Sequence, residues 1–531
     1  MAEPTFTSPT KRRRILFIAG AVLLVLLLAL TPPLMNVSRL QRRIVTSISA
    51  SLGRPVHIES ASLHLLPMPG FTLKYIVVNE DPAFGNEPII RGDTVEATLR
   101  VASLWRRQVE FSTVRFIDPS VNIVRNGDGR WNLESLLMHA SRMEAAPTDQ
   151  KHAGDEPRFP YIEATNARVN LKLGDEKTPY SLTAADFALW LPEPNQWRVR
   201  VEAQPARTDT GVSDPGTLRI EGAFERADQL GEVPVDLKAT WHDVQLGEAS
   251  RLLTGEDANW RGRLHLDIAL VGHLNNAHLS THLTVNELRR ADFVPDQMLD
   301  LNSNCQATFN AVTSTLQNAA CLIPDADAAP LSIASPLVDL HHLDTAALVL
   351  NDNAIPLPWA FSWAKLLSQR IPATAAPEGS VALHLERSAD AAWAGNATVT
   401  LSATSSKTPQ ALVFNAAPNT AAGEDPACKS ALVLAPTAVR LEDASSLQLN
   451  GQLSACGYGL HASGSASTQQ LQQATAAVPF LFDTVNTLAH SGNATAHLDL
   501  SCARLWSEPE QHCSAPAPAA TTHKPTTRRR R

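Results

Sequence analysis

Residues 95–101 read VEATLRV, and their strict alternation decides the fold class. Apolar residues stand at positions 95, 97, 99 and 101, with polar residues between them. In an extended strand this alternation places one apolar and one polar face on opposite sides. The same pattern recurs in WRVRVEAQ, GTLRIEGAFER and HLSTHLTVNEL. The sequence therefore predicts a mainly β protein whose antiparallel sheet has one wet face, with short helices between some strands.

The N-terminal segment predicts a membrane anchor. The basic residues 11–14 precede an uninterrupted apolar run, 15–30, and the segment 15–35 approaches the roughly 20 residues that span a bilayer. Basic flanks stay on the cytoplasmic side, so we expect residues 1–14 in the cytoplasm and the rest of the chain outside it. A cleaved signal peptide is the alternative, although no small-x-small cleavage site follows the run.

Residues 36–55 are expected to form an amphipathic helix beside the membrane, because their apolar residues recur at helical spacing. Arg39, Arg42 and Arg43 lie outside the apolar stripe and are candidates for contact with lipid phosphates. A second interpretation, in which the helix caps the following domain, is compatible with the first.

The remainder of the 531-residue chain divides by its pattern of strands. A β domain is expected at 56–145 and a charged, irregular linker at 146–157. A short helix followed by a glycine-led strand then recurs at Gly262, Gly379 and Gly492, which suggests repeated modules. Stacked modules form an elongated body in which each contacts its neighbours. The expected modules are 158–270, 271–388 and 389–502. A low-complexity basic tail is expected at 503–531.

The six cysteines all lie in the second half of the chain and suggest disulfides in an oxidising compartment. Six cysteines allow fifteen connectivities, so nearest-neighbour pairing is a hypothesis. Zinc binding is one alternative, but no pair has the C-x-x-C spacing. Unpaired buried thiols are another. The hypothesis pairs Cys305 with Cys321, Cys428 with Cys456, and Cys502 with Cys513.

Composition and motifs argue against several functions. The formal net charge is -8, which disfavours a nucleic-acid partner. The chain lacks the phosphate-loop, zinc-protease, nucleophile-elbow and dinucleotide motifs. We therefore expect no enzymatic activity, no cofactor and no metal site.

Residues 12–137 resemble the AsmA family of the Gram-negative cell envelope. The resemblance is carried by Leu52-Gly53-Arg54-Pro55-Val56, Leu66-Pro67 with Pro69-Gly70, Asp81-Pro82 with Phe84-Gly85, Asp118-Pro119, and Asn126 and Gly129 with Trp131-Asn132. Beyond this region the likeness is architectural, in a β-rich chain of repeated modules.

The resemblance implies a long sheet curled into a groove, related to bridge-like lipid-transfer proteins. It implies an inner-membrane anchor with the N-terminus in the cytoplasm and the body in the periplasm. It also implies a role in outer-membrane biogenesis, with the inner membrane and phospholipid as partners. The rival function is a non-enzymatic scaffold or assembly factor that binds other envelope proteins through its sheet edges.

In such a groove the apolar face of the strands would contact acyl chains. The candidates for this contact are Leu73, Tyr75, Val77, Val95, Leu99 and Val101. A closed sandwich produces the same alternation, because its inward-facing residues also alternate with polar ones. The sequence therefore leaves an open face and a closed core as alternatives.

Overall fold

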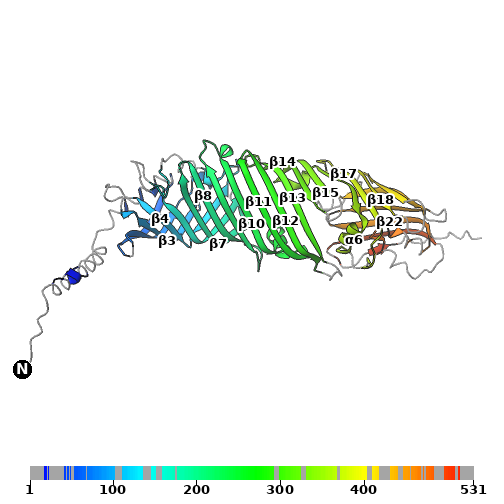
Figure 1. Ribbon diagram of the computed structural model, residues 1–531, viewed down its shortest axis with the longest axis horizontal. Helices are drawn as coiled ribbons and strands as arrows, with labels where there is room; N and C mark the ends of the chain where they lie inside the picture. Colours follow the sequence, from blue (N-terminus) through cyan, green and yellow to red (C-terminus); the bar gives the residue numbers. More distant parts are fainter. Residues whose placement is uncertain are drawn as a thin grey trace, which may run out of the picture. The chain divides into compact units, whose positions relative to one another are not determined.

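The protein is mainly β with a few short helices, as the sequence predicts (Figure 1). It divides into two compact units: unit 1 is Met1–Asp257, Leu264–Thr281 and Phe309–Thr313, and unit 2 is Ala258–Arg263, His282–Thr308 and Ser314–Arg531. The computed structural model describes residues 13, 17–20, 22, 41–42, 45–46, 48–49, 53–66, 68–101, 110–134, 145–150, 158–173, 176–291, 298–324, 331–367, 371–390, 392–402, 410–417, 431–440, 446–454, 456–467, 471, 474–476, 478–482, 496–506, 508 and 512–514.

Unit 1 contains a sheet built from the first ten strands. Their bounds are β1 (Val56–His64), β2 (Gly70–Val78), β3 (Ile90–Leu99), β4 (Phe111–Ile117), β5 (Ser120–Arg125), β6 (Tyr161–Leu173), β7 (Glu176–Glu193), β8 (Gln196–Arg207), β9 (Thr217–Glu225) and β10 (Pro234–Gln245). Strands β1 to β3 and β6 to β10 pair antiparallel in chain order. The 3₁₀ turns of this unit are η2 (Pro82–Phe84) and η3 (Leu230–Glu232).

Strands β4 and β5 depart from the purely antiparallel sheet that the sequence predicts. Both lie between β3 and β6, and both pair with β6 in parallel. A parallel pair needs a crossover of a dozen or more residues, which the stretch between β5 and β6 supplies. The sheet is therefore mixed. Residues 146–150, expected in a linker, include a buried Thr148 whose N–H donates to the Leu191 carbonyl of β7 at 2.8 Å.

Tyr75 inverts the alternation of β2, because its backbone is left-handed with φ 52°. Before it Leu73 is buried, and after it Ile76 is buried, so the buried side changes from odd to even positions. A positive φ is uncommon for a bulky residue and marks a local departure from regular strand geometry. The structure thus corrects the expectation that Leu73, Tyr75 and Val77 share one face.

The apolar side of β1 to β3 is closed by packing. Its buried cluster consists of Val56, Ile58, Phe71, Leu73, Ile76, Val78, Ile89 and Val95. Val45 and Ile48 pack against this cluster, and the described residues around them are helical. The described helical residues within the expected segment 36–55 therefore pack on the domain that follows them.

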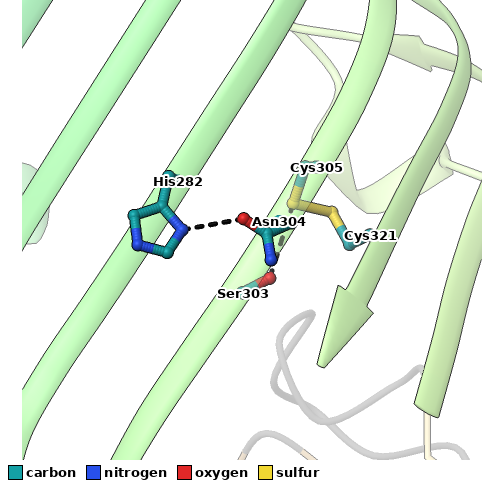
Figure 2. The surroundings of a disulfide bond; sticks show 5 residues. All are labelled: His282, Ser303, Asn304, Cys305 and Cys321. Atoms are coloured by element: carbon teal, nitrogen blue, oxygen red, sulfur yellow. Dashed lines mark hydrogen bonds between the residues drawn. A yellow bond between two sulfur atoms is a disulfide. The ribbon is translucent and has the colours of Figure 1, made fainter. Parts of the chain in front are cut away.

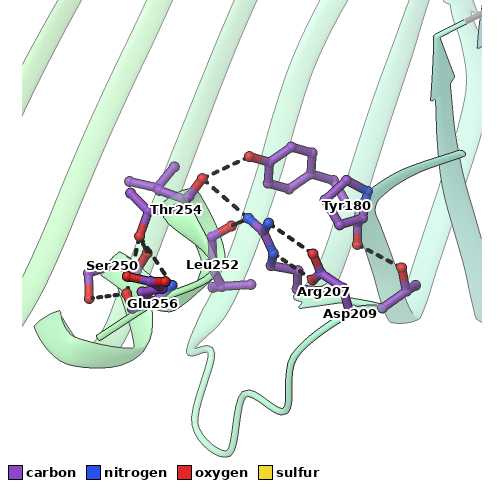
Figure 3. A network of polar contacts seen from close by, with 10 residues as sticks. Tyr180, Arg207, Asp209, Ser250, Leu252, Thr254 and Glu256 are labelled. Atoms are coloured by element: carbon purple, nitrogen blue, oxygen red, sulfur yellow. Dashed lines mark hydrogen bonds and ion pairs between the residues drawn. The ribbon is translucent and has the colours of Figure 1, made fainter. Parts of the chain in front are cut away.

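Helix α5 (Leu246–Thr254) follows β10, and its last backbone carbonyls accept hydrogen bonds from side chains of neighbouring strands. Arg207 donates to the carbonyl of Leu252 at 3.1 Å, and the Tyr180 hydroxyl donates to that of Leu253 at 2.8 Å. Arg207 also pairs with Asp209 (Figure 3). A guanidinium is favourable at a helix C-terminus, where the carbonyls carry partial negative charge.

Strands β11 to β13 contribute residues to both units, and the later strands belong to unit 2. Their bounds are β11 (Trp260–His273), β12 (Asn276–Arg290), β13 (Leu299–Asn310), β14 (Thr315–Ile323), β15 (Leu331–Asp339), β16 (Leu348–Pro356), β17 (Gly379–Arg387), β18 (Trp393–Leu401), β19 (Gln410–Ala417), β20 (Leu432–Arg440), β21 (Ser446–Leu453), β22 (Gly457–Ala466), β23 (Ala496–Leu505) and β24 (His512–Ser514). From β14 onward they pair antiparallel in chain order.

The core of unit 2 forms around helix α6 (Leu357–Lys365), whose Leu357, Phe361 and Ala364 are buried. They pack in a second cluster with the strand residues Leu412, Phe414, Leu447 and Leu449, and with Leu471 and Leu481, which are helical and lie between β22 and β23. The 3₁₀ turn of this unit is η4 (Leu343–Thr345).

The helix-then-glycine pattern is present at two of its three expected places. Helix α5 precedes Gly262, and α6 precedes Gly379. Both glycines have positive φ, and a Cβ on Gly379 would lie 2.1 Å from the carbonyl oxygen of Thr400. Glycine is therefore required by the close approach of a neighbouring strand. Gly492 lies outside the described residues.

Cys305 of β13 and Cys321 of β14 form a disulfide, which confirms the first expected pair (Figure 2). Cys456 and Cys502 each take part in a disulfide. The register of β23 and β24 sets Cys502 opposite Cys513. Cys428 lies outside the described residues, so its bond to Cys456 stays a prediction.

Of the expected membrane segment 15–35, the structure describes residues 17–20 and 22, which are helical. Among the residues placed by the structure, no helix is long and apolar enough to cross a membrane.

Candidate functional site

Two neighbouring rows of residues cross the sheet of unit 1 on its apolar side. The first row runs through directly paired residues of successive strands: Ala61, Leu73, Val95, Phe116, Ala164, Phe187, Val201, Ile220 and Ala239. The second row, beside it, is Phe71, Ala97, Val114, Ile162, Leu189, Val199, Gly222 and Leu237. Directly opposed residues project to the same side of a sheet, so the rows share one apolar face.

Burial changes along this face. In the first row Leu73 and Val95 are each 2 % exposed. Ile220 and Ala239 of the same row are only half-buried. The side chains toward β10 therefore remain in partial contact with solvent.

The second row repeats the change from buried to half-buried. Phe71 is 6 % exposed at the β2 end, whereas Val199 and Leu237 are half-buried. We define the central apolar face as the half-buried part of both rows on β7 to β10: Phe187, Leu189, Val199, Val201, Ile220, Leu237 and Ala239. In these two rows the same sheet face is thus buried on β2 and β3 and half-buried throughout β7 to β10.

Small residues lie where the packed part meets the central apolar face. They are Ala164, Ala167, Ala185 and Ala203, all buried, and the neighbouring Phe116, Phe187 and Val201 pack against them. Phe116 also packs against the closed cluster of β1 to β3. The apolar surface is consequently continuous from the closed cluster to the central apolar face.

The opposite face of the sheet carries a row of charges of alternating sign. The charged residues of the row are Glu96, Arg115, Glu163, Arg200, Glu221 and Lys238, and the uncharged Ala188 stands between Glu163 and Arg200. Arg115 Nε lies 2.5 Å from Glu163 Oε1. Opposite charges on directly paired residues favour the register, while each exposed ion pair contributes little on its own. The charged face is therefore the wet one.

The six residues expected to contact lipid do not come together. Leu73 and Val95 are buried in the closed cluster, and Leu99 packs against it. Tyr75 and Val101 are exposed, at 57 % and 51 %. Val77 is half-buried. The accessible apolar residues instead lie on β7 to β10, in strands whose alternation resembles that of VEATLRV.

Of the expected membrane-surface residues, Arg42 is helical and exposed. Arg39 and Arg43 lie outside the described residues. In the described part of the chain, no group of three or more metal-binding side chains comes together.

Residues of the sequence motifs converge with Glu80 on one polar cluster, which we define as Arg54, Glu80, Asp81 and Asn132. The side chains of Arg54, Glu80 and Asn132 are buried, whereas that of Asp81 is 44 % exposed. Arg54 Nη2 lies 3.4 Å from Glu80 Oε1, and Arg54 Nη1 lies 3.0 Å from Asp81 Oδ2. Asn132 is fully buried and its Nδ2 donates to Glu80 Oε2 at 2.5 Å. Buried charges are tolerated when they are paired and hydrogen-bonded in this way.

The polar cluster joins three segments that are far apart in the sequence. Asn132 also accepts from the Val124 N–H and donates to the Asn122 carbonyl, so it ties the turn after β5 to the sheet. Glu80 was not singled out by sequence reasoning, although it directly precedes the Asp81-Pro82 motif. These motif residues hold the turn after β5, the end of β2 and the start of β1 together.

The Ala83 backbone N–H donates to Asp81 and, together with the Arg54 guanidinium, lowers the pKa of the Asp81 carboxyl. The ionised form is stabilised because both partners are hydrogen-bond donors to it.

Comparisons with known proteins bear on the same region. A comparison with curated proteins and one with solved structures each find no match. Residues 10–174 match the family model described as AsmA family, a range that contains the polar cluster and the closed end of the apolar face. This match confirms the resemblance found in the sequence, and the region 10–174 belongs to the AsmA family.

Proposed function

We propose that the chain is a periplasmic protein, anchored in the inner membrane, that binds phospholipid acyl chains on the central apolar face and thereby takes part in outer-membrane biogenesis. Membership of the AsmA family suggests an envelope-related function. The observation that carries the lipid proposal is the change of burial along one row, from Leu73 at 2 % exposure to a half-buried Ile220.

An apolar surface that the chain itself leaves partly uncovered favours an apolar ligand. Contiguous exposed apolar surface is uncommon on monomeric proteins and marks interaction sites. Covering such surface gains about 25 cal/mol per Å². An acyl chain fits this face because it needs no hydrogen-bond partners, and the row offers aliphatic and aromatic side chains only. The proposed role is binding or transport, without enzymatic activity or a cofactor.

The proposal is tested by placing one arginine on either face of β9. Ile220→Arg introduces a charge into the central apolar face, and Glu221→Arg introduces the same side chain on the charged face next to it. We expect phospholipid to co-purify with the wild type and with Glu221→Arg, and to be lost from Ile220→Arg. Lipid retained at the wild-type level by a folded Ile220→Arg protein would contradict the proposal.

The membrane location is tested separately. A reporter that is active only in the cytoplasm, fused after Leu137, is expected to give no signal. Strong activity of this fusion would refute the proposed topology while leaving the lipid test intact.

A further inference from the structure

One end of the sheet in unit 1 exposes a group of large apolar side chains. Leu66 and Met68, in the connection between β1 and β2, are 60 % and 64 % exposed, and Val101 beyond β3 is 51 % exposed. The Leu99 N–H donates to the Pro69 carbonyl at 2.8 Å, which holds the end of β3 beside this connection. We define the apolar tip as Leu66, Met68 and Val101.

The apolar tip lies at the far end of β1 and β2 from the polar cluster. Arg54 is separated from the start of β1 by Pro55 alone, and Glu80 follows the end of β2, whereas the tip stands at the hairpin connection. One end of these strands is therefore fixed by the buried ion pair of Arg54 with Glu80, and the other presents apolar side chains to solvent. Solvent exposure of three large apolar residues together calls for a partner.

Hydrogen bonds of the N-terminal helical residues show in which direction the chain approaches β1. Ser49 Oγ accepts from the Val56 N–H at 3.1 Å, and Gln41 Nε2 donates to the Ile58 carbonyl at 3.0 Å. Followed toward the N-terminus, from Ser49 to Gln41, the contacts thus advance along β1 in the direction of the hairpin connection. In the sequence, the apolar run 15–30 precedes Gln41.

The sequence that follows Val101 has the composition of a membrane interface. Val101 is followed by ASLWRR, which places Leu104 and Trp105 directly before Arg106 and Arg107. Tryptophan is enriched at the headgroup level of bilayers, and arginine is attracted by anionic lipids. Arg42 adds an exposed positive charge on the helical segment.

We infer that the apolar tip inserts into the surface of the bilayer that holds the N-terminal anchor. The inference rests on the proposed membrane anchor, and it adds a second attachment point at the β1–β2 connection. An anchor alone leaves a domain free to tilt, whereas a second contact fixes the orientation of the sheet relative to the membrane. Shallow insertion of this kind buries apolar side chains while basic neighbours stay among the headgroups.

The test uses the full chain reconstituted in vesicles of phosphatidylethanolamine and phosphatidylglycerol. An environment-sensitive fluorescent amino acid replaces Leu66 or Met68, and some vesicles contain lipids with a nitroxide on the acyl chain. Leu253 of α5 is the matched control, because it is also 64 % exposed and apolar. We expect the nitroxide lipids to quench emission at 66 and 68 and to leave emission at 253 unchanged.

Flotation of the vesicles separates the possible failures. A chain that floats without quenching at either 66 or 68 refutes the insertion of the tip and leaves the anchor standing. Equal quenching at 253 shows adsorption over the whole surface and also overturns the inference. A chain that does not float refutes the anchor and the inference together, while the co-purification test of the central apolar face stays independent of this outcome.

Discussion

Arginine substitutions at two positions of one cross-strand row separate a packed core from an open face. Leu73 and Ile220 occupy the same row, on β2 and β9, but Leu73 is 2 % exposed and Ile220 is half-buried. We predict that Leu73→Arg destabilises unit 1 far more than Ile220→Arg. The two changes introduce the same charge, so the difference reports the surroundings.

The magnitude follows from what each side chain loses. Leu73 loses the burial of a leucine, about 1.5–3 kcal/mol, and an uncompensated buried charge adds about 3–5 kcal/mol. The sum is comparable with the whole stability of a domain, about 5–15 kcal/mol. At Ile220 the guanidinium can stay hydrated at the end of its apolar stem, so we expect a cost of about 1 kcal/mol from the lost partial burial.

Thermal unfolding followed by circular dichroism, with limited proteolysis to locate the unfolded region, measures the difference. A change of 1 kcal/mol shifts Tm by roughly 2–4 °C in a domain of 150–250 residues. Ile220→Arg should therefore melt close to the wild type, and Leu73→Arg should lose its cooperative transition or be degraded. Equal losses at the two positions would show that the face is closed at β9 as well, and the reasoning would fail.

Two further predictions concern the polar cluster and the disulfides. Because the pKa of Asp81 is lowered in the folded protein, its ionisation stabilises the fold above the ordinary carboxyl pKa, and this contribution is lost as the pH falls through the lowered value. The difference in Tm between wild type and Asp81→Asn should accordingly be small, since the side chain is 44 % exposed, and should vanish in acid; a difference that persists at low pH contradicts the assignment. Mass spectrometry of unreduced peptides should find Cys428 bonded to Cys456 and Cys502 to Cys513, and any other pairing of these four refutes the nearest-neighbour scheme.

The alternation of polar and apolar residues predicts most of the local fold. It locates strands such as β3 and β8, and the cysteine spacing predicts the bond between Cys305 and Cys321. The parallel pairing of β4 and β5 with β6 is not readable from alternation, because it depends on how a long connection crosses the sheet. Nor does the alternation reveal the left-handed Tyr75, at which the buried side changes.

The candidate site was harder to predict than the fold. Val95 and Ile220 stand in equally regular alternating strands. Val95 belongs to a buried cluster that residues such as Val45 and Ile48 cover. That covering comes from elsewhere in the chain, so it cannot be read from the strand itself. For the same reason the convergence of Arg54, Glu80 and Asn132 is visible only in three dimensions.

The central claim, that acyl chains lie on the central apolar face, is tested most directly by photo-crosslinking in living cells. A photoreactive amino acid at position 220 faces the apolar side of β9, and one at position 221 faces the charged side. The account predicts phospholipid adducts, identified by mass spectrometry, at 220 and not at 221. Protein adducts at 220 without any lipid adduct, or equal lipid labelling at both positions, would contradict it.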